Sequence, residues 1–389
     1  MADSIANQWS ISLRPKSFKE YFGNDRLKKY FYSSAKNKSW PTATLLQGQF
    51  GGGKTTAAQI IAQMMVCQNP DEEGNPCCEC ASCKAIIEEK FNRDVMQIDG
   101  GQASKDTIIE TITNFVSTPP WKDSHKIIIL EEVQELSQKA KNSLLKLIET
   151  RRPHVHYIFT SMEDMKASGL TSRCVSFKFP RADIPSIMYY LKAVMEKTGM
   201  WTDETIPQDF KLQGLQLIAA NSEGSYRQAT QILEQCYKTR VYDLETVQKE
   251  FGLVNIADFQ ELLLAVLNGD VSEKVYNALV NSENYNQTFN LIMKVISDAE
   301  CFRLFGDVSG KDRDNDWWHQ KLVQQAAQLA NHKNYKIMRD GFEKMQQDNS
   351  AYLKLSTYLI GVCKIVDACK SNATTAAAPA GGRRIIQQQ

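Results

Sequence analysis

The chain has 389 residues, of which 42% are hydrophobic and 23% are charged, and its formal net charge is +1. That length favours two or three domains, and the near-neutral charge excludes a global basic field for nucleic acid, so any DNA contact must come from a local surface. The sequence contains no run of about 18 apolar residues, so no membrane span is predicted. Residues 1–14 lack a signal-peptide core, and we therefore expect a cytoplasmic protein with no membrane partner.

An N-terminal arm over residues 1–40 is followed by a predicted strand, loop and helix over 41–66. The loop is a complete G-x-x-x-x-G-K-[ST] pattern, Gly48-Gln49-Phe50-Gly51-Gly52-Gly53-Lys54-Thr55, with Thr56 next. Glycines let backbone N–H groups approach phosphate oxygens, a lysine reaches the β- and γ-phosphates, and the hydroxyl binds Mg²⁺. A ligand-free glycine turn would explain the loop alone but not the flanking strand and helix. We therefore predict a site for a nucleoside triphosphate and Mg²⁺.

Five of the ten cysteines fall within residues 67–83. The four residues Cys67, Cys77, Cys80 and Cys83 form a C-x9-C-x2-C-x2-C pattern. In a large cytosolic chain this clustering favours a metal over disulfides, and four thiolates suit a structural, tetrahedral Zn²⁺. An iron–sulfur cluster uses the same ligands, but the spacing is not that of a ferredoxin. Cys78 is left as a free thiol or an alternative ligand.

Strands alternate with helices along the next part of the chain. The apolar runs predict strands at 95–98, 126–130, 155–160 and 175–179, with helices at 107–116 and 137–150. Such alternation is typical of an α/β fold with a parallel sheet, and we place this domain at 1–179 with the cysteine module inserted at about 67–90. After Pro180 the pattern becomes helical, with helices predicted at 184–195 and 215–237.

Two acids follow directly on the strand 126–130, Glu131 and Glu132. Beside a phosphate loop, one carboxylate supports Mg²⁺ and the next activates the attacking water, so we assign these roles to Glu131 and Glu132 respectively. The same acids alone would suit a solvated helix N-terminus. The neighbouring strand ends in Thr160-Ser161, whose hydroxyls are candidates for positioning the water or sensing the γ-phosphate.

Two arginines are candidate phosphate contacts. Arg173 lies in Ser172-Arg173-Cys174 and Arg227 follows Glu223-Gly224-Ser225-Tyr226. A guanidinium can stabilise charge on a transferring phosphoryl group, but on the residues alone an ordinary surface arginine is the better interpretation of Arg173. Arg227 would either close over the nucleotide or face solvent.

From about residue 13 to 254 the order of these motifs resembles one family, the bacterial replicative clamp-loader ATPases, the gamma/tau subunits of DNA polymerase III within the AAA+ class. The matching segments are Leu13-Arg14-Pro15-Lys16-Ser17-Phe18, the phosphate loop, the inserted cysteines, Glu131 to Ser137, Asn142 to Lys146, Thr160-Ser161, Ser172-Arg173-Cys174 and Gly224 to Arg227. The resemblance implies that Arg14 and Pro15 lie beside the adenine, that Arg173 acts on the ATP of a neighbouring subunit, and that Arg227 is a second nucleotide sensor.

Three departures from the family pattern stand out. Glu131 replaces the usual Asp and is one methylene longer, which matters because Mg²⁺ tolerates geometric error poorly. Gln134 replaces a His, and Thr150-Arg151-Arg152 replaces Glu-Pro-Pro. The added arginines would face either DNA inside a ring or solvent.

The resemblance also implies an architecture and a function. We expect a helical lid domain at 180–254, an all-α collar for oligomerisation at 255–370, and a disordered tail at 371–389, without the long extension of tau-type subunits. The implied function is ATP-dependent loading of a sliding clamp onto primer–template DNA by a ring of related subunits or of copies of this chain. DNA would be gripped by its phosphates.

Three alternatives stay open at this stage. A nucleotide-binding but hydrolysis-poor structural subunit would fit Glu131. Another AAA+ DNA-remodelling ATPase would share the fold, although the cysteine insertion and the Ser-Arg-Cys motif argue against it. A zinc-dependent nucleic-acid-binding protein would explain the cysteines but not the ATPase core around them.

Overall fold

The computed structural model describes residues 8–101, 107–121 and 123–251, so the predicted collar and tail lie outside the described residues. The chain divides into two compact units. Of the described residues, one unit contains those up to Ile206 and Ser222–Arg240, and the other contains Pro207–Asn221 and those from Val241 onward. Among the described residues, no helix is long and apolar enough to cross a membrane.

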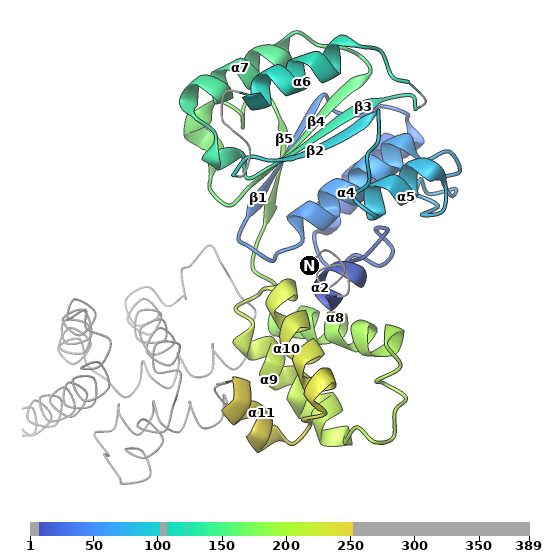
Figure 1. Ribbon diagram of the computed structural model, residues 1–389, viewed down its shortest axis with the longest axis vertical. Coiled ribbons are helices and arrows are strands. Elements are labelled where there is room, and N and C mark those ends of the chain that lie inside the picture. The colour runs from blue at the N-terminus through green and yellow to red at the C-terminus, as the bar shows by residue number, and fades with distance from the viewer. Residues whose placement is uncertain (1–7, 102–106, 122, 252–389) are drawn as a thin grey trace, which may run out of the picture. The chain divides into compact units, whose positions relative to one another are not determined.

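A five-stranded parallel sheet forms the centre of the first unit, with strand order β2-β3-β4-β1-β5 (Figure 1). The strands are β1 (Ala43–Gly48), β2 (Val95–Asp99), β3 (Lys126–Glu131), β4 (Val155–Ser161) and β5 (Val175–Phe179). The apolar runs of β3 and β4 are buried because helices cover both faces of the sheet. The predicted α/β fold with a parallel sheet is therefore confirmed.

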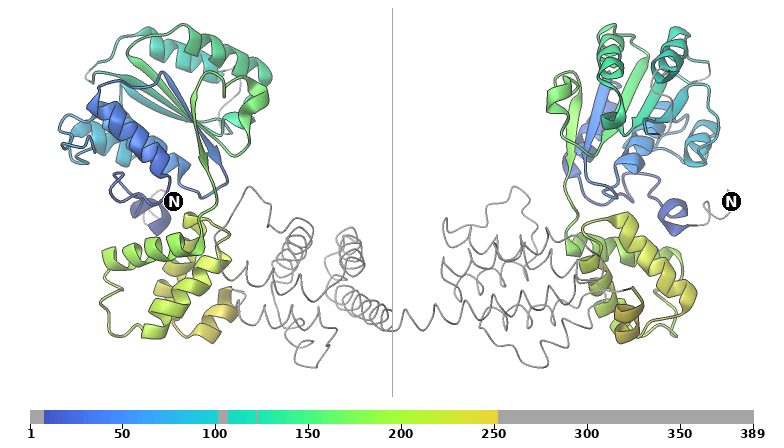
Figure 2. Two further views of the ribbon diagram at one scale, coloured as in Figure 1. Left: turned by 180° about the vertical axis from the view of Figure 1, so that it is seen from behind. Right: turned by 60° about the vertical axis from the view of Figure 1, so that its left-hand side comes forward.

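Helices occupy both sides of this sheet (Figures 1 and 2). Those of the first unit are α2 (Trp9–Ser12), α3 (Asp25–Lys36), α4 (Lys54–Val66), α5 (Ala81–Ile87), α6 (Thr107–Ser117), α7 (Gln138–Glu149), α8 (Ile184–Lys197) and α10 (Tyr226–Thr239), with short 3-10 turns at Val133–Glu135 and Met165–Ser168. One core packs α3 and α4 against the sheet, and a second packs α6 and α7 against the opposite face. α4 is buried along nearly its whole length, which fixes the loop before it.

The second unit contributes a π-helical turn at Phe210–Gly214, α9 (Leu215–Asn221) and α11 (Leu244–Phe251) to the described residues. The single helix predicted over 215–237 was wrong, because α9 ends at Asn221 and α10 begins at Tyr226. Gly224 takes a φ of 76° between them, and the Ser225 hydroxyl accepts the N–H of Gln228 as an N-cap. A left-handed glycine followed by a capping serine ends one helix and starts another.

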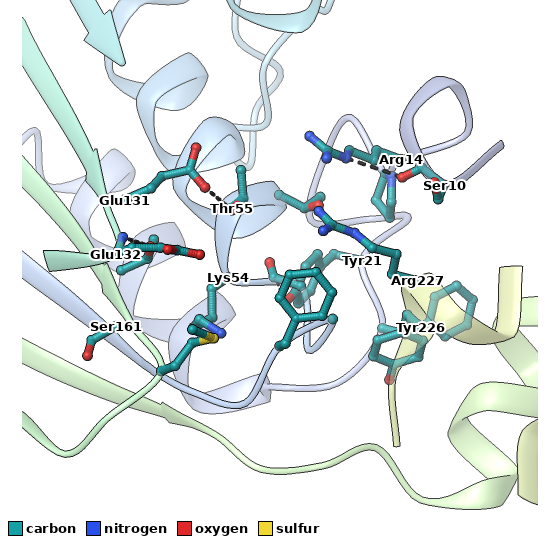
Figure 3. Close-up of a pocket in the computed structure, with 18 of the residues that line it drawn as sticks. Ser10, Arg14, Tyr21, Lys54, Thr55, Glu131, Glu132, Ser161, Tyr226 and Arg227 are labelled. Carbon is teal, nitrogen blue, oxygen red and sulfur yellow. Dashed lines mark hydrogen bonds between the residues drawn. The ribbon is translucent and has the colours of Figure 1, made fainter. Parts of the chain in front are cut away.

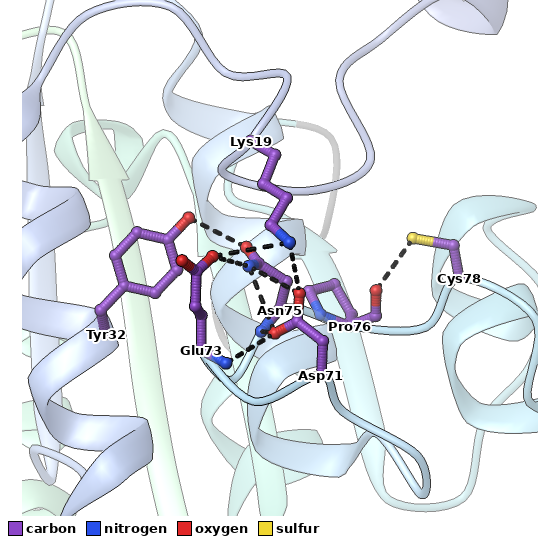
Figure 4. Close-up of polar contacts among 7 residues, drawn as sticks. All are labelled: Lys19, Tyr32, Asp71, Glu73, Asn75, Pro76 and Cys78. Carbon is purple, nitrogen blue, oxygen red and sulfur yellow. Dashed lines mark hydrogen bonds and ion pairs between the residues drawn. The ribbon is translucent and has the colours of Figure 1, made fainter.

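The cysteine module is fastened to the N-terminal arm and to α3 (Figure 4). Asp71 accepts the backbone N–H groups of Glu73 and Asn75 over 3.0 and 2.8 Å and pairs with Lys19 at 2.8 Å. Burial alone would raise the pKa of Asp71, but these donors outweigh it and lower the pKa to about 2. Tyr32 on α3 donates to the Asn75 side chain over 3.0 Å. These contacts hold the module in a defined position on the domain.

Candidate functional site

The phosphate loop connects β1 to α4 at the carboxyl edge of the sheet. Gly51 and Gly53 take φ values of 75° and 89°, which L side chains rarely adopt. A Cβ on Gly51 would lie 1.9 Å from the Ser225 Oγ, and one on Gly53 would lie 2.6 Å from the Tyr21 hydroxyl. Tyr21 itself donates to the Gly53 carbonyl over 3.2 Å. The loop thus requires glycine at both positions, because the backbone has positive φ and because Ser225 and Tyr21 occupy the space that a Cβ would need.

Lys54 folds back into the loop (Figure 3). Its Nζ donates to the carbonyl oxygens of Gly48 and Gln49, each over 2.7 Å. Burial lowers the pKa of Lys54 to about 8, against the opposing effect of Glu132. An anion at this site would favour the charged form of the lysine.

Glu131 and Thr55 meet across the cleft (Figure 3). The Thr55 hydroxyl donates to one oxygen of the Glu131 carboxylate, and the Gln97 amide donates to the other over 2.7 Å. A hydroxyl oxygen in contact with a carboxylate is a donor set that suits a hard cation such as Mg²⁺. The length of the Glu131 side chain therefore does not prevent its contact with Thr55 of the phosphate loop.

Glu132 takes a left-handed conformation with a φ of 51°, rare for a residue with a side chain. Its backbone N–H donates to the Thr160 hydroxyl over 3.3 Å. Burial, together with the nearby carboxylates of Asp99, Glu135 and Glu131, raises the pKa of Glu132. A carboxylate held at a strand end with a raised pKa is a stronger proton acceptor than an ordinary glutamate.

The second hydroxyl at the end of β4 makes a different contact. The Ser161 Oγ donates to the Glu163 carbonyl over 2.9 Å and accepts the Glu163 N–H over 3.0 Å. Its hydroxyl is engaged by the turn that follows the strand, whereas Thr160 contacts Glu132.

Arg14 and Arg227 reach the cleft from elements far apart in the sequence (Figure 3). The Arg227 guanidinium lies 4.5 Å from the centre of the Phe50 ring. Burial, with the nearby charge of Arg14, lowers the pKa of Arg227. Arg14 is held by the Ser10 carbonyl at 3.3 Å and by Glu89 at 3.5 Å. Two guanidinium groups at one cleft favour a polyanionic ligand.

Arg173 lies elsewhere. It is exposed, pairs with Glu149 at 2.6 Å and donates to the Gly169 carbonyl over 3.2 Å. It is not among the described residues that line the cleft of its own chain.

Most of the residues predicted for the nucleotide line this one cleft. They are Arg14, Pro15, Phe50, Gly51, Gly53, Lys54, Thr55, Thr56, Glu131, Glu132, Thr160, Ser161 and Arg227. Gly48, Gln49 and Gly52 belong to the same loop but are not among the lining residues, and the first two act through their carbonyls on Lys54.

The structure adds lining residues that the sequence analysis missed: Ser10, Tyr21, Phe22, Asp99, Met162, Tyr190 and Tyr226. Asp99 carried a usable signal, because it ends β2 as Glu131 ends β3, and the two are paired in register. The aromatic residues had no local signal.

The four cysteine sulfurs converge within 4.8 Å of one another. The Cys77 N–H points at the Cys67 sulfur over 3.2 Å, and the Cys80 N–H points at the Cys77 sulfur over 3.3 Å. Such N–H···S contacts are compatible with thiolates, and four thiolates at this separation suit tetrahedral Zn²⁺. Cys78 is outside the cluster, and its thiol donates to the Lys16 carbonyl over 3.4 Å.

Several known proteins that resemble this chain in sequence are subunits of DNA polymerase III. A sequence model of the family described as "DNA polymerase III, delta subunit" matches residues 23–183. The gamma/tau subunit of DNA polymerase III from Mycoplasma genitalium is 28% identical over 72% of this chain and 46% of its own length. The gamma subunit from Buchnera aphidicola is 30% identical over 59% of this chain and 60% of its own length. The tau subunit from Bacillus subtilis is 30% identical over 57% of this chain and 38% of its own length.

The chain thus spans less than two thirds of the length of these relatives. Among solved structures, the Holliday junction branch migration motor RuvB from Thermotoga maritima matches 66% of this chain and 79% of its own, with a TM-score of 0.43 and 15% identity. That likeness is too low to carry an argument, and the assignment comes from the sequence relatives. These relatives, at 24–30% identity, support a divergent gamma/tau-type subunit of DNA polymerase III.

Proposed function

We propose that this chain is an ATP-hydrolysing subunit of a replicative clamp loader, which couples ATP binding and hydrolysis to loading a sliding clamp onto primer–template DNA. One observation carries the proposal. The lysine and threonine of the phosphate loop and the two acids at the end of β3 line one cleft, with Thr55 in contact with Glu131. This is the arrangement that phosphoryl transfer to water requires.

In this proposal the phosphate loop and Lys54 bind the β- and γ-phosphates of ATP. Thr55 and Glu131 hold Mg²⁺, which neutralises charge on the phosphate oxygens. The contacts of Lys54 with the loop carbonyls keep its ammonium next to the phosphate position before ATP arrives. Arg14 and Arg227 then offset the remaining negative charge of the ligand.

Glu132 serves as the general base. Its raised pKa suits it to accept a proton from water, and Thr160 fixes its backbone. Water and the γ-phosphate are thereby oriented from two neighbouring strand ends.

Arg173 acts in trans on the ATP of a neighbouring subunit. Its exposure, and its separation from the lining of its own cleft, are compatible with that role. The pairing with Glu149 would hold the guanidinium extended in the free subunit. The partners are other loader subunits or copies of this chain.

The four cysteines bind one structural Zn²⁺. Four thiolates complete a tetrahedral shell and leave no open position on the ion for a substrate, so their convergence favours a role in folding over one in catalysis.

Two other candidates stay in play. A nucleotide-binding subunit with poor hydrolysis would follow from Glu131 in place of Asp, but the contact between Glu131 and Thr55 favours a working metal site. Another AAA+ DNA-remodelling ATPase would use the same cleft.

Steady-state ATP hydrolysis by the purified chain, with and without its cognate clamp and primed DNA, tests the proposal. We expect stimulation by clamp and DNA together, and a loss of about 10²- to 10⁴-fold in Glu132→Gln with ATP affinity retained. Turnover no higher than in Glu132→Gln, with all partners supplied, would leave only the hydrolysis-poor subunit. Turnover stimulated by DNA but indifferent to the clamp would favour a different DNA-remodelling ATPase.

A further inference from the structure

Gln97 on the edge strand β2 contacts the acid that the proposed function assigns to Mg²⁺. Its Nε2 donates to the Glu131 Oε1 over 2.7 Å, while Thr55 donates to the Oε2 of the same carboxylate. Both oxygens of Glu131 are therefore held, one from the strand beside it and one from the phosphate loop. A glutamate side chain has one more rotatable bond than an aspartate, so without such contacts it would populate more positions.

The orientation of the Gln97 amide is determined by a hydrogen-bond chain. The buried Gln59 side chain on α4 donates through Nε2 to the Gln97 Oε1 over 3.4 Å and to the Glu89 Oε1 over 3.3 Å. A carboxylate accepts only, so Glu89 fixes the amide of Gln59 with its NH₂ outward. The Gln97 oxygen then faces Gln59, and its NH₂ faces Glu131.

An uncharged hydrogen-bond donor such as the Gln97 amide suits the group of acids around Glu131. Three carboxylates gather at the carboxyl ends of β2 and β3, because Asp99 is paired in register with Glu131 and Glu132 follows directly. Mutual repulsion among acids favours side-chain positions that separate them. An amide N–H on Glu131 keeps that carboxylate beside Thr55 without adding a further charge.

We propose that Gln97 is a positioning residue that holds Glu131 for Mg²⁺, and that it sets the Mg²⁺ requirement for tight nucleotide binding. The inference rests on the proposed ATPase function. It explains how the long side chain of Glu131 is kept in one position beside Thr55. Hydrogen bonds to metal-supporting groups are typically worth 10- to 100-fold in metal affinity.

The experiment measures the affinity of the full chain for a fluorescent, non-hydrolysable ATP analogue over a series of Mg²⁺ concentrations and in EDTA. Gln97→Leu should raise the Mg²⁺ concentration for half-maximal tight binding about tenfold, with EDTA affinity and unfolding midpoint unchanged. Gln138→Leu, the same change at an exposed position on α7, should match the wild type. In a Glu131→Gln background, Gln97→Leu should add no further shift.

An unchanged Mg²⁺ dependence in Gln97→Leu would overturn the inference. So would an equal loss of affinity in EDTA and in Mg²⁺, because that result would mean a structural role. A wild-type chain that bound the analogue with no help from Mg²⁺ would also overturn it while leaving nucleotide binding intact. Absence of binding under all conditions would instead remove the proposed function, and this inference with it.

Discussion

ATP affinity should fall as pH rises above about 8, because Lys54 is buried with an unusually low pKa. In the free protein, burial lowers the pKa of Lys54 to about 8. A bound triphosphate favours the charged lysine and raises that pKa. The lysine must therefore take up a proton on binding at alkaline pH, whereas below its pKa in the free protein it is already charged.

The size of the effect follows from the pKa of the free protein. At pH 9, one unit above the pKa of about 8, only about a tenth of the lysine is protonated, so affinity should be about tenfold lower than at pH 7. Each further pH unit should weaken binding about tenfold until the pKa of the complex is reached. Below pH 8 the contribution of Lys54 is fully present.

The assay is the affinity for a non-hydrolysable ATP analogue between pH 7 and pH 9.5 at constant salt. Lys54→Arg is the matched control, because a guanidinium stays charged over this range and should remove the pH dependence whatever its own affinity. An equally steep loss in Lys54→Arg would assign the titration to another group. A flat profile in the wild type would refute the argument that burial in the loop lowers the pKa of Lys54.

Three further predictions concern the loop, the sheet and the cysteine module. Gly51→Ala should weaken ATP binding and destabilise the fold by more than Gly199→Ala in chemical unfolding. Both positions have positive φ, costing about 1–2 kcal/mol, but only a Cβ at 51 meets another side chain. Burial lowers the pKa of His156 to about 4 from the usual value of about 6.5. As pH falls, the unfolded chain therefore takes up a proton at this histidine before the folded chain does. The free energy of unfolding should decline by about 3 kcal/mol between pH 6.5 and pH 4. The difference between wild type and His156→Gln in unfolding across that range measures it, and a constant difference would contradict it. Cys80→Ser should lose the bound zinc and lower the unfolding temperature, whereas Cys78→Ser should keep both by metal analysis and thermal melting. Equal metal loss in the two variants would show that Cys78 is a ligand.

Much of the fold and of the site could be predicted because several polar side chains of the cleft lie at the carboxyl ends of strands. Apolar runs mark parallel strands, and the residues directly after them must meet at one edge of the sheet, which is how Glu131, Glu132 and Thr160 were found. The break between α9 and α10 was missed because the apolar positions on either side keep helical spacing, although Gly224 and Ser225 were the local signal against one helix.

Other residues of the site could not be predicted from the sequence. Tyr21 supports the loop from the N-terminal arm, and Gln97 contacts Glu131 from a neighbouring strand. Each contact joins segments more than 30 residues apart in sequence. No composition or spacing marks a lone tyrosine or glutamine for such a role, since only the folded sheet brings the partners together.

The phosphate loop contacts the N-terminus of helix α10 through three consecutive residues, Ser225, Tyr226 and Arg227. The Tyr226 N–H donates to the Gly51 carbonyl over 3.1 Å, at the first residue of α10. The capping Ser225 lies where a Gly51 side chain would be, and the next residue but one, Arg227, lies over Phe50. If ATP binds as proposed, a phosphate that draws the N–H groups of the loop inward would pull on the N-terminus of α10, and its charge would attract Arg227 from the same helix. Discrimination between ATP and ADP at the loop would in this way become a force on α10, because a ligand shifts a conformation only through contacts that differ between its states.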